Sequence, residues 1–255
     1  MTFNRLYDDE SNFEIEPNYL WKFFHYNSQL DTHRQLFYVP VKYNENSIEN
    51  RKYNKVVEFD SNIYETNNNY LLKSIVKRKT IRDFAKKEIY INQIQSLIQF
   101  SFGCRTIDDK NIITSKVYPS AGARYPHELY LVVFDVIGLE NGIYHYDQIN
   151  NTLGFIISGD YNEKLYDCTM KQEHVLNAAC ILILTAKITK TTSKYGDRGY
   201  RYVLIDAGHI GQNICLVSQE IGLDVVPIGG FYDRKVSSVL DIGKDEYPIY
   251  IFSLG

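Results

Sequence analysis

Cysteine and histidine are scarce in this chain, and neither occurs at the spacing of a metal site. The four cysteines form no Cys-x-x-Cys pair and the six histidines no His-x-x-x-His pair, so we expect no metal ion held by the protein. Widely separated cysteines in apolar surroundings are typical of buried thiols in a reducing compartment.

Two further absences narrow the class of protein. Lys and Arg total 28 against 31 Asp and Glu, a net charge of -3, so no basic field is present to attract nucleic acid or an anionic membrane surface. No run approaches the roughly 18 apolar residues of a membrane span. Residues 1–10 become acidic where a signal peptide would become apolar. We expect a soluble cytoplasmic protein that binds neither nucleic acid nor membrane.

The length of 255 residues suits one substantial domain and is too short for two full ones. Residues 1–69 are rich in Asn and Tyr, with two apolar patches, Tyr19–Phe24 and Leu36–Pro40, and a break at Asn67–Asn69. We interpret them as an N-terminal extension that packs on a main domain of residues 70–255. The 22 tyrosines favour a planar ligand, a large subunit interface or an aromatic core.

Apolar periodicity predicts an α+β fold, with helices packed against a sheet. Strands, including one hairpin, are expected at residues 129–134, 142–146, 153–157, 180–186 and 247–252. Helices are expected over Tyr70–Arg78 and from Ile91 to a stop at Gly103.

The strongest helical pattern covers Tyr202–Gly222. Its apolar stripe runs beside a row of small residues, Gly208, Gly211, Cys215 and Ser218. A helix of this kind can approach another helix or a ligand closely.

Residues 194–201, Lys-Tyr-Gly-Asp-Arg-Gly-Tyr-Arg, gather three cations, a carboxylate and two phenols just ahead of that helix. An ammonium beside a phenol favours the phenolate, so Lys194 and Tyr195 are one way to make a general base near neutral pH. A solvated basic turn is the competing interpretation. We expect Arg198 and Arg201 to pair with Asp197 or Asp206 and so fix the loop.

Two other segments suggest ligand binding. In Pro-Ser-Ala-Gly-Ala-Arg-Tyr-Pro, residues 119–126, small side chains let a flat or anionic ligand approach the backbone, although a turn bounded by prolines explains the same residues. Arg78, Lys79 and Arg82 surround Thr80, a grouping that suits a phosphate. Cations capping a helix C-terminus are the alternative.

Four blocks, in this order, resemble the SagB-type dehydrogenases, an FMN-dependent branch of the nitroreductase superfamily. The blocks are Arg78–Phe84, Pro119–Pro126, Lys194–Asn213 and Gly222–Phe231. The resemblance runs from about Tyr70 to Gly255. It implies a nitroreductase-like fold, with a central, mostly antiparallel sheet packed by helices and the long helix at the heart of a homodimer.

The resemblance also implies where FMN binds. Arg78, Thr80 and Arg82 match an Arg-x-Ser-x-Arg element that holds the phosphate and ribityl chain, with Thr80 in place of Ser. Residues 119–122 match the loop along the isoalloxazine, where backbone N–H groups and a hydroxyl meet the ring, and Arg124 would favour negative charge on it. The expected cofactor-binding residues are Arg78, Lys79, Thr80, Arg82, Pro119, Ser120, Ala121, Gly122, Gln212, Gly229 and Gly230. For Gln212, as a buried helix amide, a structural role is an equal alternative.

Enzymes of this branch oxidise peptide thiazolines or oxazolines to thiazoles or oxazoles, removing a proton from a ring carbon and passing a hydride to the flavin. Lys194 and Tyr195 match the catalytic pair, with Tyr195 as proton acceptor and Lys194 as its activator or substrate holder, the roles being exchangeable. The implied partners are a second copy, an azoline-containing precursor peptide, and a cyclodehydratase or scaffold protein. A general NAD(P)H-dependent nitro- or quinone reductase and a catalytically inactive scaffold subunit remain alternatives.

Overall fold

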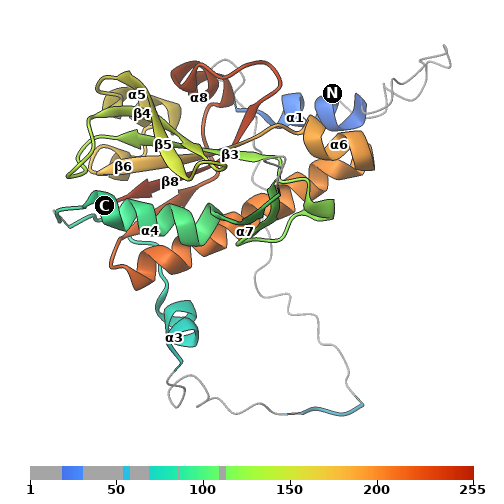
Figure 1. The fold of residues 1–255 in the computed structure, drawn as a ribbon, viewed down its shortest axis with the longest axis horizontal. Coiled ribbons are helices and arrows are strands. Elements are labelled where there is room, and N and C mark those ends of the chain that lie inside the picture. Colours follow the sequence, from blue (N-terminus) through green and yellow to red (C-terminus); the bar gives the residue numbers. More distant parts are fainter. Residues whose placement is uncertain (1–18, 31–53, 58–68, 86, 109–112) are drawn as a thin grey trace.

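A six-stranded sheet in the order β5-β4-β3-β6-β8-β7 organises the structure, and each of its five strand pairs is antiparallel. The computed structural model describes residues 19–30, 54–57, 69–85, 87–108 and 113–255 (Figure 1). The strands are β3 His127–Val133, β4 Gly142–Asp147, β5 Thr152–Ser158, β6 Cys180–Ala186, β7 Val225–Ile228 and β8 Tyr247–Leu254. The predicted α+β fold with a mostly antiparallel sheet is confirmed. All the predicted strands are present, and the short β7 was not predicted.

The helices begin and end close to the predicted positions where their apolar pattern is long. They are α1 Tyr19–Ser28, α3 Tyr70–Lys77, α4 Ile91–Phe102, α5 Asn162–Cys168, α6 Thr189–Tyr195, α7 Arg198–Glu220 and α8 Asp233–Leu240. Asn69 caps α3 by accepting from the N–H groups of Leu71 and Leu72, and Gly103 ends α4 as predicted. A small sheet pairs β1 Cys104–Ile107 with β2 Ile113–Lys116, and a short 3-10 turn, η2, covers Ala121–Ala123.

Helices cover both faces of the large sheet (Figure 1). On β3, Leu129, Leu131 and Val133 pack with α4 and α7, whereas Tyr130 and Val132 pack with α5 and α8. Because side chains alternate across a strand, a strand covered on both sides must be apolar throughout, which explains its continuous apolar run.

The long helix α7 has one buried and one exposed apolar face. A Cβ on Gly211 would lie 2.9 Å from the Tyr250 ring and 3.2 Å from Phe252, so only glycine lets the helix lie this close to β8. On the other side Leu204 and Ile205 are 40% and 48% exposed, and a Cβ on Gly208 would meet nothing within 4 Å. Of the row of small residues, Gly211, Cys215 and Ser218 are buried, whereas Gly208 is exposed.

Helix α1 lies against the main domain. Trp21 is 3% exposed, stacks on Tyr200 with ring centroids 6.0 Å apart, and donates its backbone N–H to Asp197 Oδ1 at 3.1 Å. The predicted patch at residues 36–40 lies outside the described residues, and the domain division at residue 69 stays a prediction. No helix in the described part of the chain is both long and apolar enough to cross a bilayer.

Candidate active site

Lys194 and Tyr195 end a short helix, α6, instead of lying in the predicted loop. Gly196, with φ 58°, stops α6, and α7 begins two residues later. A Cβ on Gly199 would lie 2.9 Å from the backbone N and Cα of Thr192, so glycine is needed for α6 and α7 to meet at this corner. The corner fixes the direction in which the two side chains leave α6.

The Lys194–Tyr195 pair contacts the predicted flavin loop, residues 119–125. Lys194 Nζ lies 5.2 Å from the centroid of the Tyr195 ring. Gly122, in η2, has φ 57°, and a Cβ placed there would collide with the Tyr195 hydroxyl and lie 2.9 Å from Lys194 Nζ. Two segments about 70 residues apart in the sequence, each recognised separately, thus form one site in which Gly122 leaves room for the pair.

The flavin loop, residues 119–125, is tied to α7 through Asp206, which is 3% exposed. Ser120 Oγ donates to Asp206 Oδ2 at 2.6 Å, and the N–H of Ala121 donates to the same carboxylate. Burial raises the pKa of Asp206, partly offset by these two hydrogen bonds. The expected pairing of Asp206 or Asp197 with Arg198 or Arg201 is wrong, because Asp206 holds the loop and Asp197 holds the backbone of α1.

Arg124 ties the same loop to α6. Its Nε donates to the Lys190 carbonyl at 2.7 Å, and its Nη2 donates to Ser193 Oγ at 3.4 Å. Hydrogen bonds from a charged donor are stronger than those between neutral groups. In this structure Arg124 therefore fixes the loop against α6.

The predicted phosphate cluster follows directly on α3. Arg78 is the C-cap of α3 and half-buried, whereas Lys79, Thr80 and Arg82 are exposed. The charge of Arg78 reaches Cys215 on α7, where burial raises the pKa of the thiol and Arg78 lowers it. Within the described ranges, no carboxylate forms an ion pair with these cations. The position of Arg78 as C-cap of α3 is therefore compatible with an anion-binding site formed by these cations.

The glycine pair that follows β7 lies close to Arg82. Gln172 Nε2 donates to the Gly230 carbonyl at 3.3 Å, and Gln172 Oε1 lies 3.1 Å from His174 Nε2. Burial, and then the charge of Arg82, lower the pKa of His174. The structure thus joins the first and last of the four blocks around Gln172 and His174, two residues that the sequence did not single out.

The other three predicted cofactor-binding residues lie in three different places. Gly229 lines a cavity of about 120 Å³ with Tyr200, Leu204 and Asp233. Gln212 is exposed on the free face of α7, so the prediction that it is a buried amide is wrong. Pro119 is exposed at the start of the flavin loop.

The predicted site residues therefore form two groups along α7. The Lys194–Tyr195 pair and the flavin loop lie near its N-terminal half, and α3 with the phosphate cluster lies near its C-terminal end (Figure 1). Asp206 and Cys215, which mark the two groups, are nine residues apart, or about 14 Å at the helical rise per residue.

A buried lysine that the sequence did not reveal supports the flavin loop. Lys116, 1% exposed, donates through Nζ to the Tyr118 hydroxyl at 3.0 Å and to Gln148 Oε1, and lies 4.4 Å from the centre of the Phe102 ring. Burial lowers its pKa to about 8. Its backbone N–H donates to the Tyr125 hydroxyl at the end of the loop, at 3.3 Å.

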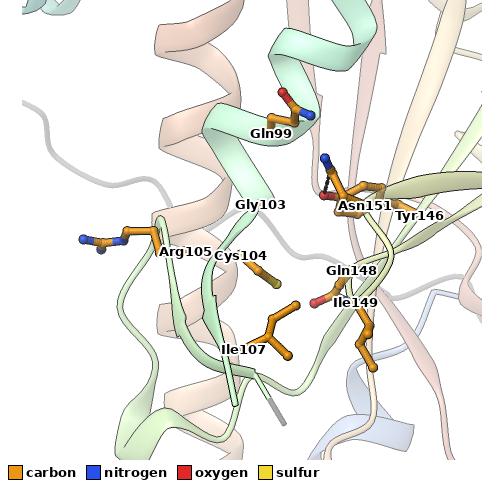
Figure 2. Close-up of a pocket in the computed structure, with 9 residues that line it drawn as sticks. All are labelled: Gln99, Gly103, Cys104, Arg105, Ile107, Tyr146, Gln148, Ile149 and Asn151. Atoms are coloured by element: carbon orange, nitrogen blue, oxygen red, sulfur yellow. Dashed lines mark hydrogen bonds between the residues drawn. The ribbon is translucent and has the colours of Figure 1, made fainter. Parts of the chain in front are cut away.

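Gln148 connects this lysine to α6 and to a cavity. Its Nε2 donates to Glu128 Oε2 at 3.1 Å, and Glu128 in turn pairs with Lys190 at 3.5 Å. Burial raises the pKa of Glu128, but the hydrogen bond from His145 and nearby lysine charges outweigh it and lower the value to about 2. Gln148 also lines a cavity of about 450 Å³ between the end of α4, β1 and the β4–β5 turn (Figure 2).

Comparison with known proteins fits this architecture. The model of the nitroreductase family matches residues 75–255, a range that contains all four blocks. The chain belongs to the nitroreductase family, and the resemblance to its SagB-type branch is confirmed.

Three similar proteins indicate the range of that family. The MJ1384 protein of Methanocaldococcus jannaschii, classed with nitroreductases, is 33% identical over 71% of this chain and 88% of its own length. The microcin B17-processing protein McbC of Escherichia coli is 27% identical over 62% of this chain and 59% of McbC. In the structure of the E. coli microcin synthetase McbBCD complex with truncated pro-MccB17 bound, one chain matches at 20% identity with a TM-score of 0.66, over 92% of this chain and 91% of that one.

Proposed function

We propose that this protein oxidises thiazoline or oxazoline rings of a ribosomally made peptide to thiazoles or oxazoles, with FMN as cofactor. The observation that carries the proposal is the contact between Gly122 and the Lys194–Tyr195 pair, because it places the proposed proton acceptor beside the exposed backbone of the loop that is proposed to bind the flavin. McbC, a peptide-processing protein, supports the substrate class.

The residues present suit FMN. Arg78 and Arg82 offer guanidinium groups without a carboxylate partner in the described chain, as a phosphate requires. Gly229 is exposed, and a Cβ on it would meet nothing within 4 Å, which lets a flat ring approach its backbone. When bound, FMN would supply the acceptor for the hydride that leaves the azoline ring.

The protein itself supplies the proton transfer. We assign Tyr195 as the base that takes the proton from the ring carbon and Lys194 as the cation that stabilises the phenolate or holds the substrate. Arg124 and the Lys190–Glu128 pair hold α6, so the two side chains keep their place beside Gly122. Aromatisation removes two hydrogens from each ring.

An azoline peptide tests this function directly. Incubation of the purified protein with such a peptide should lower the peptide's mass by two hydrogen atoms per ring. Because MJ1384 is classed with nitroreductases, the competing activity is reduction of nitroarenes or quinones by NAD(P)H. Rapid reduction of bound FMN by NADPH together with an unchanged azoline peptide would favour that activity, and a colourless, inactive protein would favour a scaffold subunit.

The phosphate assignment predicts loss of cofactor on removal of either arginine. Arg78→Ala or Arg82→Ala should weaken FMN binding about tenfold to a hundredfold, since a hydrogen bond to a charged group contributes about 1.5 to 3 kcal/mol. Flavin absorbance per mole of protein, measured after desalting, reports occupancy. Lys87→Ala is the control, because Lys87 pairs with Asp224 outside the cluster. Full occupancy in both arginine variants would remove the phosphate site.

We also propose a homodimer with α7 at its centre. Tyr70 and Leu71 of α3 are 79% and 59% exposed, and the free face of α7 presents Leu204, Ile205 and the open Gly208. In a two-fold pair of antiparallel α7 helices, the phosphate cluster of one copy would lie towards the Lys194–Tyr195 pair of the other. Light scattering at micromolar concentration should give about twice the chain mass of 29.7 kDa, and a monomer would exclude the shared site.

A further inference from the structure

The flavin loop holds a conformation that its own residues do not favour. Gly122, Ala123 and Tyr125 have φ values of 57°, 52° and 43°, in the left-handed region. For Ala and Tyr this conformation is unfavourable, so it persists only where surrounding contacts determine it. Inside the loop, Ala123 N–H donates to Ser120 O at 3.0 Å and Arg124 N–H to Ala121 O at 3.3 Å, which leaves the loop's position on the protein to other groups.

Asp206 supplies that position. Its buried carboxylate accepts from Ser120 Oγ and from the Ala121 N–H, and Ser120 Oγ accepts the Tyr125 N–H at 3.0 Å. The two ends of the loop thus meet at one hydroxyl, which is bonded to α7. Gly122, the next residue after Ala121, is the one that faces Tyr195 and Lys194.

We infer that Asp206 is the positioning residue of the active site, setting the flavin loop against the Lys194–Tyr195 pair. The inference rests on the proposed function for its cofactor. One consequence concerns Ser120. Its only hydroxyl hydrogen is directed at Asp206, so Ser120 anchors the loop and does not donate to the flavin ring, in contrast to the role expected from the resemblance.

Four variants test the inference: Asp206→Ala, Asp206→Asn, Ser120→Ala and the Ser120→Ala/Asp206→Ala double variant. FMN affinity, from quenching of flavin fluorescence, should fall about tenfold to a hundredfold in Asp206→Ala, because a buried charged hydrogen bond is lost. Asp206→Asn should stay within about tenfold of wild type, since its amide oxygen still accepts from Ala121 and its amide group donates to Ser120 Oγ. The double variant should be no weaker than Asp206→Ala.

A merely structural role would change the melting temperature but give neither rescue by Asn nor coupling to Ser120. Ser218→Ala is the matched control, because Ser218 is buried on α7 with a hydroxyl that has no hydrogen-bond partner among the described residues. Equal losses for Asn and Ala, or additive losses for Ser120 and Asp206, would overturn the inference.

Amide hydrogen exchange separates this inference from the proposed function, because it needs no cofactor. In protein free of FMN, segment 119–125 should exchange faster in Asp206→Ala than in Asp206→Asn, with the rest of the chain unchanged. If azoline peptide is not oxidised but this difference holds, only the proposed reaction fails. If the two variants exchange alike, Asp206 does not position the loop, whatever the reaction.

Discussion

Lys194→Ala and Tyr195→Phe proteins are expected to bind FMN and to oxidise an azoline peptide about a hundred- to ten-thousand-fold more slowly than wild type. The expected loss is large because Tyr195 is assigned as proton acceptor and Lys194 as the cation beside it, 5.2 Å from the ring centroid. Flavin absorbance checks cofactor binding, and mass spectrometry of the peptide over time gives the rate.

The two single variants should lose activity for the same reason. A base and its activator act as a unit, so the double variant should be hardly slower than the slower single one. Lys235 and Tyr232 provide a matched control, because Lys235 Nζ lies 4.9 Å from the Tyr232 ring centroid at α8, on the other face of the sheet. Near-normal rates for Lys194→Ala and Tyr195→Phe would mean that another group accepts the proton.

The strands and the long helix could be predicted because their buried residues follow the local pattern of apolar residues in the sequence. β6 was predicted with its observed ends, and the hairpin of β4 and β5 pairs as expected. Helix α6 could not be predicted, since its seven residues include three threonines and two lysines, which suit a turn equally well. It is stabilised by packing on α7 at Gly199 and by hydrogen bonds from Arg124. The first contact exists only once α7 is in place, and the second comes from a residue remote in sequence.

The site residues could be recognised in the sequence as separate motifs, but their arrangement in space could not be predicted. Gly122 and Tyr195 meet only because η2 and α6 both pack beside α7, which no local pattern encodes. For a related reason, the sequence did not reveal that Asp206 and Lys116 hold the flavin loop in place. A charged residue on a helix or at a strand end usually lies in solvent, and their burial depends on Ser120 and Gln148 from distant segments.

Gly122→Ala is expected to abolish most of the activity through the contact that defines the site. An alanine at φ 57° costs about 1 to 2 kcal/mol, and its Cβ would collide with the Tyr195 hydroxyl. Either the loop or the tyrosine must move, and a displacement of about 1 Å in a reacting group costs about a hundredfold in rate. Turnover of azoline peptide should fall at least that far.

A second substitution distinguishes this collision from general damage to the loop. Tyr195→Phe removes the oxygen that the new Cβ would meet and leaves the ring carbon Cζ 3.3 Å from it. The Gly122→Ala/Tyr195→Phe protein should therefore regain much of any FMN affinity lost in Gly122→Ala, while its turnover stays as low as that of Tyr195→Phe. Gly243→Ala, where a Cβ meets nothing within 4 Å, should behave as wild type. Normal turnover by Gly122→Ala would show that the flavin loop and the Lys194–Tyr195 pair do not work in contact, and the proton acceptor would then lie outside this corner of the protein.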